Sequence, residues 1–128
     1  MFEKYIVVEN GTKNIVENGH ITGFQVSARV PYYRGLGISM IEDIKLTVDG
    51  KAIAPEQILV ELHGNTYTLA AMETEGTDRW EFGEVGLIKV MQPGGLSSGE
   101  HTIEVGFNLR ISYMPVNAFR QGTKVLFF

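Results

Sequence analysis

The chain has 128 residues, of which 44% are apolar, 20% are charged and none is cysteine, and its formal net charge is −4 at pH 7. This length and composition fit one globular domain over residues 1–128, and the lack of cysteine excludes disulfides, thiolate catalysis and cysteine-ligated zinc. The acidic balance argues against a nucleic-acid binder and against a protein of anionic membrane surfaces, because both classes present basic patches.

Period-two alternation of apolar and polar residues runs through most of the chain, and this pattern is typical of β-strands with one buried face. The segments with such a pattern are, in chain order, 5–9, 24–30, 44–48, 58–62, 67–69, 82–91 and 102–113. In the last of these, Ile103, Val105 and Phe107 share one face and polar residues share the other. The sixth is apolar on both faces in places, which indicates a central strand or one covered by a partner.

Turn residues separate these segments. The dipeptides that tolerate positive φ, and so predict hairpin turns, are Asn10-Gly11, Asn18-Gly19, Asp49-Gly50 and Gly64-Asn65. The best helical window is Ala70–Arg79, but Gly76 and Thr77 weaken it, so we expect a loop there. About eight or nine strands at this spacing predict an all-β fold, an antiparallel β-sandwich of immunoglobulin-like or jelly-roll-like type.

Residues suited to catalysis are sparse. The three histidines, His20, His63 and His101, share no metal-ligand spacing with other ligand-type residues, so they are either strand-end histidines or ligands that converge from three strands. There is no nucleophile elbow, and no order of serine, histidine and aspartate is suggestive. The sequence therefore predicts no catalytic residue and no metal site in this chain.

One short segment combines residue types that carry binding energy. Tyr32, Tyr33 and Arg34 lie between Pro31, which stiffens the approach, and Gly35, which permits a sharp turn. Tyrosine and arginine are enriched at protein interfaces, where they offer flat apolar faces and a fork of hydrogen-bond donors. The segment is either a contact surface or an ordinary exposed hairpin loop.

Other candidate contact residues are large aromatic side chains. Trp80 lies in the acidic run 73–84, which is either a solvated loop or a contact surface anchored by this tryptophan. Phe119 belongs to a second loop, 114–120, after the clearest strand. The apolar segment 125–128, with Phe127 and Phe128, is either a final core strand or a partly exposed tail that docks on another chain.

Segment 30–50 resembles the small β subunit of bacterial C-glycoside deglycosidases. The resemblance lies in Val30-Pro31-Tyr32-Tyr33-Arg34-Gly35, in Ser39-Met40-Ile41-Glu42-Asp43-Ile44 and in Val48-Asp49-Gly50. It implies a β-sandwich subunit that forms a hetero-oligomer with a larger α subunit. It further implies that this partner is a (β/α)8 barrel holding a divalent metal, typically Mn²⁺. The complex of this family cleaves the C–C bond between a 3-oxo-glucosyl unit and an aromatic, flavonoid-type aglycone by metal-assisted elimination.

The resemblance places the catalytic residues and the metal on the α subunit, and leaves this chain without a cofactor. The β chain then stabilises the barrel, with Tyr32, Tyr33 and Arg34 as the candidates for a wall of the active-site mouth. An alternative is a stand-alone carbohydrate-binding module that uses Tyr32, Tyr33 and Trp80 as a stacking platform. The first ten residues carry no basic region before a long apolar run, so we expect no signal peptide and a cytoplasmic protein.

Overall fold

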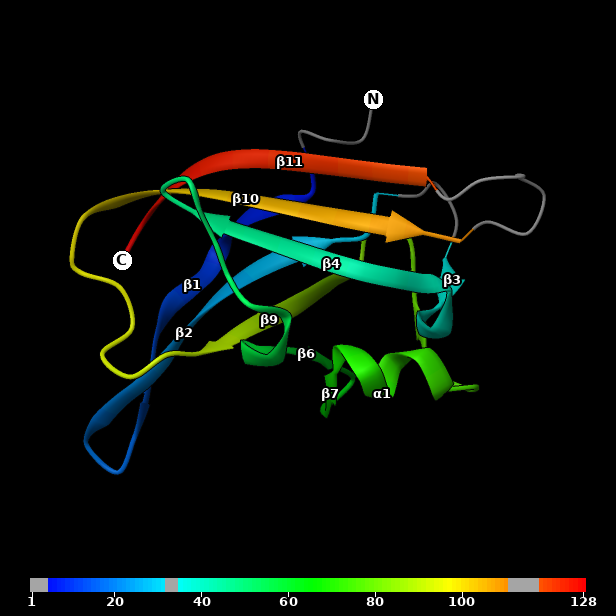
Figure 1. The fold of residues 1–128 in the computed structure, drawn as a ribbon, viewed down its shortest axis with the longest axis horizontal. Helices are drawn as coiled ribbons and strands as arrows, with labels where there is room; N and C mark the ends of the chain where they lie inside the picture. The colour runs from blue at the N-terminus through cyan, green and yellow to red at the C-terminus, as the bar shows by residue number, and fades with distance from the viewer. Residues whose placement is uncertain (1–4, 32–34, 111–117) are drawn as a thin grey trace.

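Two antiparallel sheets face each other and enclose the core in a computed structural model of the chain, which describes residues 5–31, 35–110 and 118–128 (Figure 1). The five-stranded sheet contains, in spatial order, β1 (Val7–Glu17), β2 (His20–Arg29), β9 (Val85–Met91), β6 (Ile58–Leu62) and β7 (Asn65–Thr68). The four-stranded sheet contains β11 (Ala118–Phe127), β10 (Glu100–Leu109), β4 (Ile41–Val48) and β5 (Lys51–Ala52). A two-residue strand β3 (Leu36–Gly37) pairs with β8 (Arg79–Trp80).

The alternating residues of the expected strands form the core between the sheets. The buried apolar residues of the longer strands are Val7, Phe24, Val26, Ala28, Ile41, Ile44, Leu46, Val48, Ile58, Val60, Leu62, Ile88, Val90, Ile103, Val105, Phe107, Leu109 and Leu126. In the described residues, the strands of four residues or more number eight. The predicted all-β antiparallel sandwich is therefore confirmed.

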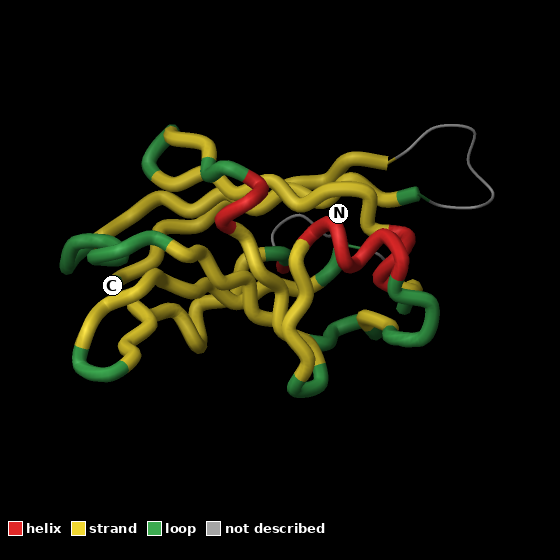
Figure 2. The backbone as a smooth tube through the Cα atoms, turned by 60° about the horizontal axis from the view of Figure 1, so that its bottom comes forward, coloured by secondary structure: helices red, strands yellow, loops and turns green. Residues whose placement is uncertain are grey.

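The expectation of a loop over Ala70–Arg79 is wrong in its first half. Helix α1 spans Leu69–Thr74, and the Thr68 hydroxyl caps it by accepting a hydrogen bond from Ala71 N at 3.0 Å. Met72 is buried, and the helix packs against β4, β6 and β7, so it bridges the two sheets (Figure 2). Two 3₁₀ turns, η2 (Ile38–Met40) and η3 (Pro55–Gln57), complete the elements. No helix in the described ranges is long and apolar enough to cross a bilayer.

Two of the four predicted hairpin turns are confirmed. Asn18 and Asp49 both have positive φ, of 51° and 49°, and each is followed by a glycine with positive φ. The third prediction is displaced by one residue, because the turn between β6 and β7 has its positive φ values at His63 and Gly64. The fourth, Asn10-Gly11, is wrong: the chain stays in β1 and bulges there, between Val8 and Lys13.

The predicted strand 82–91 begins later than expected, at Val85, and it is central, since β9 lies between β2 and β6. The apolar C-terminal segment completes β11, but only part of it enters the core. Leu126 is buried and Phe128 packs against the core, whereas Val125 and Phe127 are exposed. The prediction of a final core strand is therefore confirmed in part, and docking of this segment on another chain stays a prediction.

A side-chain amide ties the edge strand β1 to the distant loop before β10. Asn14 Nδ2 donates to the Leu96 carbonyl oxygen at 2.9 Å, and Leu96 N donates to Asn14 Oδ1 at 2.9 Å. The two residues are 82 positions apart in the sequence. This pair of bonds imitates one step of a β-ladder and holds the loop against the sandwich.

Candidate functional site

The three residues that the sequence marks most strongly, Tyr32, Tyr33 and Arg34, lie outside the described residues, as does the first part of loop 114–120. Their flanks are described. Pro31 is buried at the end of β2, and an added Cβ at Gly35 would lie 2.5 Å from Glu81 Oε2. The structure therefore fixes where the tyrosine segment leaves and rejoins the sandwich, next to the turn that contains Glu81.

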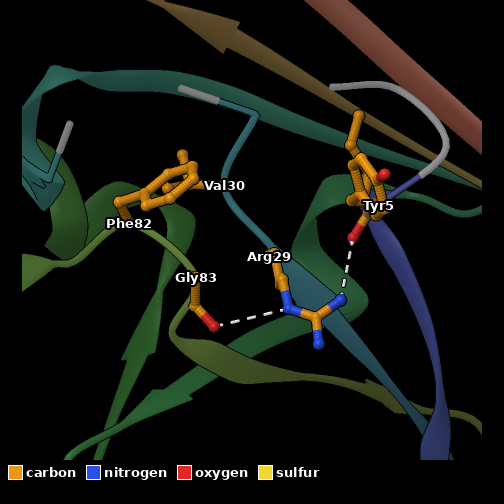
Figure 3. A pocket seen from close by; sticks show the side chains of 6 residues that line it. Tyr5, Arg29, Val30, Phe82 and Gly83 are labelled. Atoms are coloured by element: carbon orange, nitrogen blue, oxygen red, sulfur yellow. Dashed lines mark hydrogen bonds between the residues drawn. The ribbon is translucent and has the colours of Figure 1, made fainter. Parts of the chain in front are cut away.

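An apolar pocket of about 320 Å³ lies immediately before this segment (Figure 3). Its lining residues are Tyr5, Ile6, Arg29, Val30, Phe82 and Gly83. Tyr5 and Phe82 keep 53% and 58% of their surface exposed. The Arg29 guanidinium holds the two walls together, donating from Nε to the Gly83 carbonyl at 3.3 Å and from Nη1 to the Tyr5 carbonyl at 3.5 Å.

Sequence reasoning missed Tyr5 and Phe82 as candidate contact residues. The sequence predicts a strand that begins at Phe82, whereas Phe82 lies in the turn before β9, next to Gly83, whose φ is 79°. The sequence offers one signal for a turn here, Gly83, because glycine adopts positive φ at no steric cost. Tyr5 gave no such signal, since it reads as the first residue of a strand.

The prediction that Trp80 is an exposed contact residue is wrong. Its side chain is fully buried, its ring packs edge-on against Phe107 with centroids 5.4 Å apart, and its Nε1 donates to the Glu84 carbonyl at 2.8 Å. The short pairing of β8 with β3 draws the tryptophan inward. Because Trp80 offers no free face, the stacking platform of the carbohydrate-binding alternative loses one of its three aromatic residues.

The remaining aromatic candidates are spread along β11. Phe119 is 42% exposed and Phe127 is 68% exposed, and they stand near opposite ends of this strand. Phe119 covers Gly106 of β10, where an added Cβ would lie 2.6 Å from the phenylalanine Cζ. Phe128 turns toward the core instead, with its ring centroid 5.9 Å from that of Phe24. The structure therefore does not bring these three residues into one patch.

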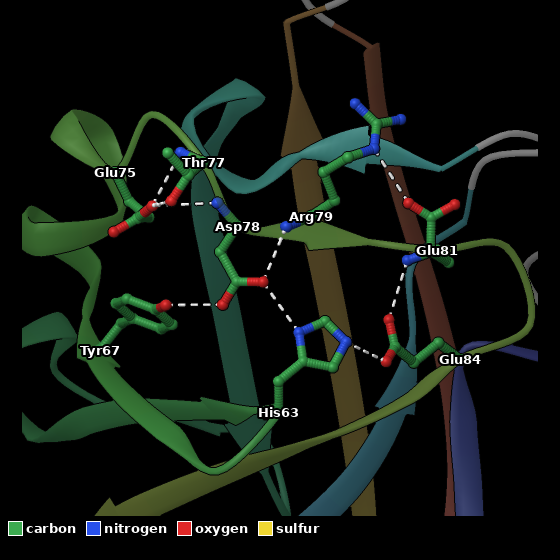
Figure 4. A network of polar contacts seen from close by, with 8 residues as sticks. All are labelled: His63, Tyr67, Glu75, Thr77, Asp78, Arg79, Glu81 and Glu84. Carbon is green, nitrogen blue, oxygen red and sulfur yellow. Dashed lines mark hydrogen bonds and ion pairs between the residues drawn. The ribbon is translucent and has the colours of Figure 1, made fainter.

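A polar network surrounds His63 at the tip of the β6–β7 hairpin (Figure 4). Its Nδ1 lies 2.8 Å from Asp78 Oδ1, and its Nε2 contacts Glu84 Oε2. The Tyr67 hydroxyl donates to the other Asp78 oxygen, Oδ2, at 2.6 Å. Glu75 Oε2 accepts hydrogen bonds from the backbone N–H groups of residues 77 and 78. His63 thus holds the 75–84 segment, which carries Trp80 and one wall of the apolar pocket.

The charges of this network are mutually supporting. Hydrogen bonds that His63 donates to the carboxylates of Asp78 and Glu84 raise its pKa. The Tyr67 hydroxyl is the main cause that lowers the pKa of Asp78, with His63 contributing further. The same bond to Asp78 raises the pKa of Tyr67 to about 12. The network therefore favours a protonated His63 beside an ionised Asp78.

Replacing His63 with asparagine is expected to destabilise the fold more at acidic than at alkaline pH. A folded-state pKa above the unfolded value of about 6.5 contributes stability that is complete below that value and disappears as pH rises through the folded pKa. Asparagine tolerates the positive φ of 53° at this position, so backbone strain does not confound the comparison.

The measurement is urea unfolding of both proteins at about pH 5.5 and pH 9, followed by the fluorescence of Trp80, the one tryptophan in the chain. The difference in the free energy of unfolding between the wild-type protein and His63→Asn should be smaller at the higher pH. An equal difference at both pH values would show that the two ion pairs of His63 do not contribute.

His101 has the partners of a serine–histidine–aspartate triad, which the sequence order did not suggest. Its Nδ1 lies 2.6 Å from Asp49 Oδ2, and its Nε2 lies 3.2 Å from Ser97 Oγ. However, Nε2 lies closer, at 2.8 Å, to the Ser97 carbonyl oxygen. The hydrogen bond with Asp49 and that with the Ser97 carbonyl raise the pKa of His101. A doubly donating imidazole cannot accept the serine proton, so this cluster fastens loops and is not a nucleophilic site.

The three histidines do not converge. His20 begins β2 beside the β1–β2 turn, His63 lies at the β6–β7 turn, and His101 belongs to β10 in the other sheet. No three histidine or carboxylate side chains in the described segments are arranged to hold a metal ion. Both ring nitrogens of His63 and of His101 already contact protein acceptors.

Comparison with known proteins identifies the family. The family model for the C-glycoside deglycosidase beta subunit matches residues 2–113. The chain belongs to this family of deglycosidase beta subunits.

Curated relatives agree with this assignment. The chain is 40% identical over 114 residues to a C-glycoside deglycosidase beta subunit of Eubacterium cellulosolvens, which covers 88% of this chain and 78% of the relative. It is 29% identical to a 3'-dehydrocarminate deglycosidase beta subunit of a Microbacterium species, over 91% of this chain and 83% of the relative. It is 30% identical to a C-glycoside deglycosidase beta subunit of Arthrobacter globiformis, over 79% and 77%.

Proposed function

We propose that this chain is the non-catalytic β subunit of a C-glycoside deglycosidase complex whose catalytic residues lie on a larger α subunit. The observation that carries the proposal is the 40% identity to a beta subunit with this activity in its name, over most of both chains. The structure supports it, because His63 and His101, the two histidines with acidic neighbours, both form ion pairs that connect separate segments of the sandwich.

The substrate class that we propose is a 3-oxo-C-glycoside with an aromatic, flavonoid-type aglycone. A relative named for 3'-dehydrocarminate supports a substrate oxidised at this position. The carbonyl acidifies the C–H bond on the carbon between it and the glycosidic carbon. A base of the α subunit removes that proton, the C–C bond to the aglycone breaks, and an acid protonates the departing aromatic carbon. A divalent metal on the α subunit, proposed to be Mn²⁺, stabilises the negative charge that develops.

The role proposed for this chain is to stabilise a (β/α)8 barrel and to form one wall of its active-site mouth. The apolar pocket supports this role, because Tyr5 and Phe82 expose more than half of their surface beside the segment with Tyr32 and Tyr33. Exposed aromatic residues around an apolar hollow are typical of interface anchors.

Co-expression with the barrel-type partner, followed by size exclusion and an assay on a 3-oxo-C-glucoside with and without added Mn²⁺, tests the proposal. We expect the two chains to co-elute and to release aglycone, and neither chain alone to do so. Elution of this chain without its partner, in a mixture that contains both, would contradict it.

The Phe82→Ala variant tests the proposed interface. We expect co-elution to weaken, or the KM of the complex to rise about tenfold, equivalent to about 1.4 kcal/mol. The matched control is Val16→Ala, which truncates an apolar side chain that is 62% exposed near the β1–β2 turn, away from the pocket. Equal behaviour of the two variants would remove the pocket from the interface.

A further inference from the structure

Strand β11 is an edge strand of unusual regularity. It pairs with β10 over ten consecutive residues without a bulge, and no described strand pairs with its other side (Figure 1). Edge strands of soluble proteins are commonly short, charged, bulged or covered, because an open edge is a template for another strand. This strand contains no proline, and its charged residues, Arg120 and Lys124, alternate with the five residues of its outer face.

In β11, the five residues whose backbone groups point away from β10 also have exposed side chains. Gly99 and Phe128 exchange both backbone hydrogen bonds, which sets the phase of the ladder that follows. Since these bonds alternate along an antiparallel pair, the even-numbered residues of β11 bond to β10 and the odd-numbered residues direct N–H and C=O to the open side. These residues also expose their side chains on the outer face, and they are Phe119, Gln121, Thr123, Val125 and Phe127.

This row is nearly palindromic. Two copies of β11 related by a two-fold axis at Thr123 would place each residue n opposite residue 246 − n of the partner copy. Phe119 then faces Phe127, Gln121 faces Val125, and Thr123 faces itself. Each of the five pairs exchanges two hydrogen bonds, about ten in all. The pairs are aromatic at both ends and threonine at the centre, which are favourable cross-strand combinations.

The strand also carries two charged residues. Arg120 and Lys124 lie on the other face of β11, where Lys124 Nζ is 3.9 Å from Glu9. In the same register Arg120 faces Leu126 and Lys124 faces Gly122, so no like charges stand directly opposite each other.

We propose that β11 mediates a two-fold association of two copies of this chain, in which the two four-stranded sheets form one continuous sheet centred on Thr123. The proposal does not depend on the partner subunit. A single strand-to-strand contact is smaller than a standard protein interface, so the association is weak for the isolated chain.

Cysteine substitution tests the register directly, because the chain has no cysteine of its own. The two copies of residue 123 would have Cα atoms about 5.5 Å apart, within the range of a disulfide. We expect Thr123→Cys to give a covalent dimer under mild oxidation. The matched control Gln121→Cys should not, because it faces Val125 of the other copy, whereas a mixture of Gln121→Cys and Val125→Cys should. Equal cross-linking of the two single variants would overturn the proposal.

A second measurement does not require a disulfide. Sedimentation of the unmodified chain at concentrations on the order of 100 µM should show a monomer–dimer equilibrium. Thr123→Pro removes one N–H from the open side without touching the ladder to β10, and it should shift this equilibrium to monomer. A wild-type chain that remains monomeric would refute the proposal. So would a Thr123→Pro variant that still dimerises yet no longer binds the α subunit, since the edge would then belong to the partner.

Discussion

Replacing Trp80 with alanine is expected to lower the free energy of unfolding by about 3–5 kcal/mol, the range for truncating a large buried aromatic residue. The side chain has no exposed surface, packs edge-on against Phe107 and donates a hydrogen bond to the Glu84 carbonyl. Its loss would leave a cavity and an unpaired carbonyl oxygen near the apolar pocket. The measurement is urea unfolding followed by circular dichroism, since the variant has no tryptophan fluorescence.

The matched control for Trp80→Ala is Val16→Ala, which should change the free energy of unfolding by no more than about 0.5 kcal/mol because the valine is largely exposed. The Trp80→Ala variant distinguishes a core role of the tryptophan from a role as an interface anchor. A protein of unchanged stability that no longer bound the α subunit would restore Trp80 as an interface anchor. A destabilised protein that still binds at low temperature would establish it as a core residue.

Replacing Gly23 with alanine is expected to destabilise the fold by about 3 kcal/mol, at the upper end of overpacking effects. An added Cβ would lie 1.9 Å from the backbone carbonyl oxygen of Val90 on the neighbouring strand β9. A backbone atom in a central strand cannot move aside as a flexible side chain can. The methyl group would therefore force β2 and β9 apart at the middle of the five-stranded sheet.

Gly76→Ala serves as the control for Gly23→Ala, because no atom lies within 4 Å of the added Cβ and its φ is ordinary for any residue. This variant should be neutral or more stable by about 0.4–1 kcal/mol, through the unfolded state. The measurement is the melting temperature of Gly23→Ala and of Gly76→Ala, each determined by thermal unfolding. Similar melting temperatures for the two variants would show that the β2–β9 contact relaxes easily.

The core was predictable because alternation reports burial one residue at a time. Residues such as Ile103, Val105 and Phe107 appear on the dry face by counting alone, and the structure buries all three. The position of Trp80 was not predictable in this way. Its sequence neighbours are charged, and a two-residue pairing of β8 with a strand more than forty positions away determines its burial.

Helix α1 was not predicted because the sequence window 70–79 extends beyond the end of the helix. Thr68 caps the N-terminus and Ala70, Ala71 and Met72 favour helix, but a window from 70 to 79 includes Gly76, which lies beyond its end. The candidate site was harder to predict. His63 meets Asp78 and Glu84 across 15 and 21 positions, and Tyr5 and Phe82 line one pocket although they are far apart in the sequence. No local pattern encodes such distances, because they follow from the order of strands in the sheet.

The hydrogen bonds between Asn14 and Leu96 bear on the folding rate of the protein. Their 82-residue separation means that the chain must search a large loop before this contact can help to stabilise it. Antiparallel sandwiches dominated by such distant contacts fold in roughly milliseconds to seconds, far more slowly than helical bundles. During that interval the regular edge of β11 can meet other incomplete chains. We therefore expect slow folding to lower the yield of native protein at high expression.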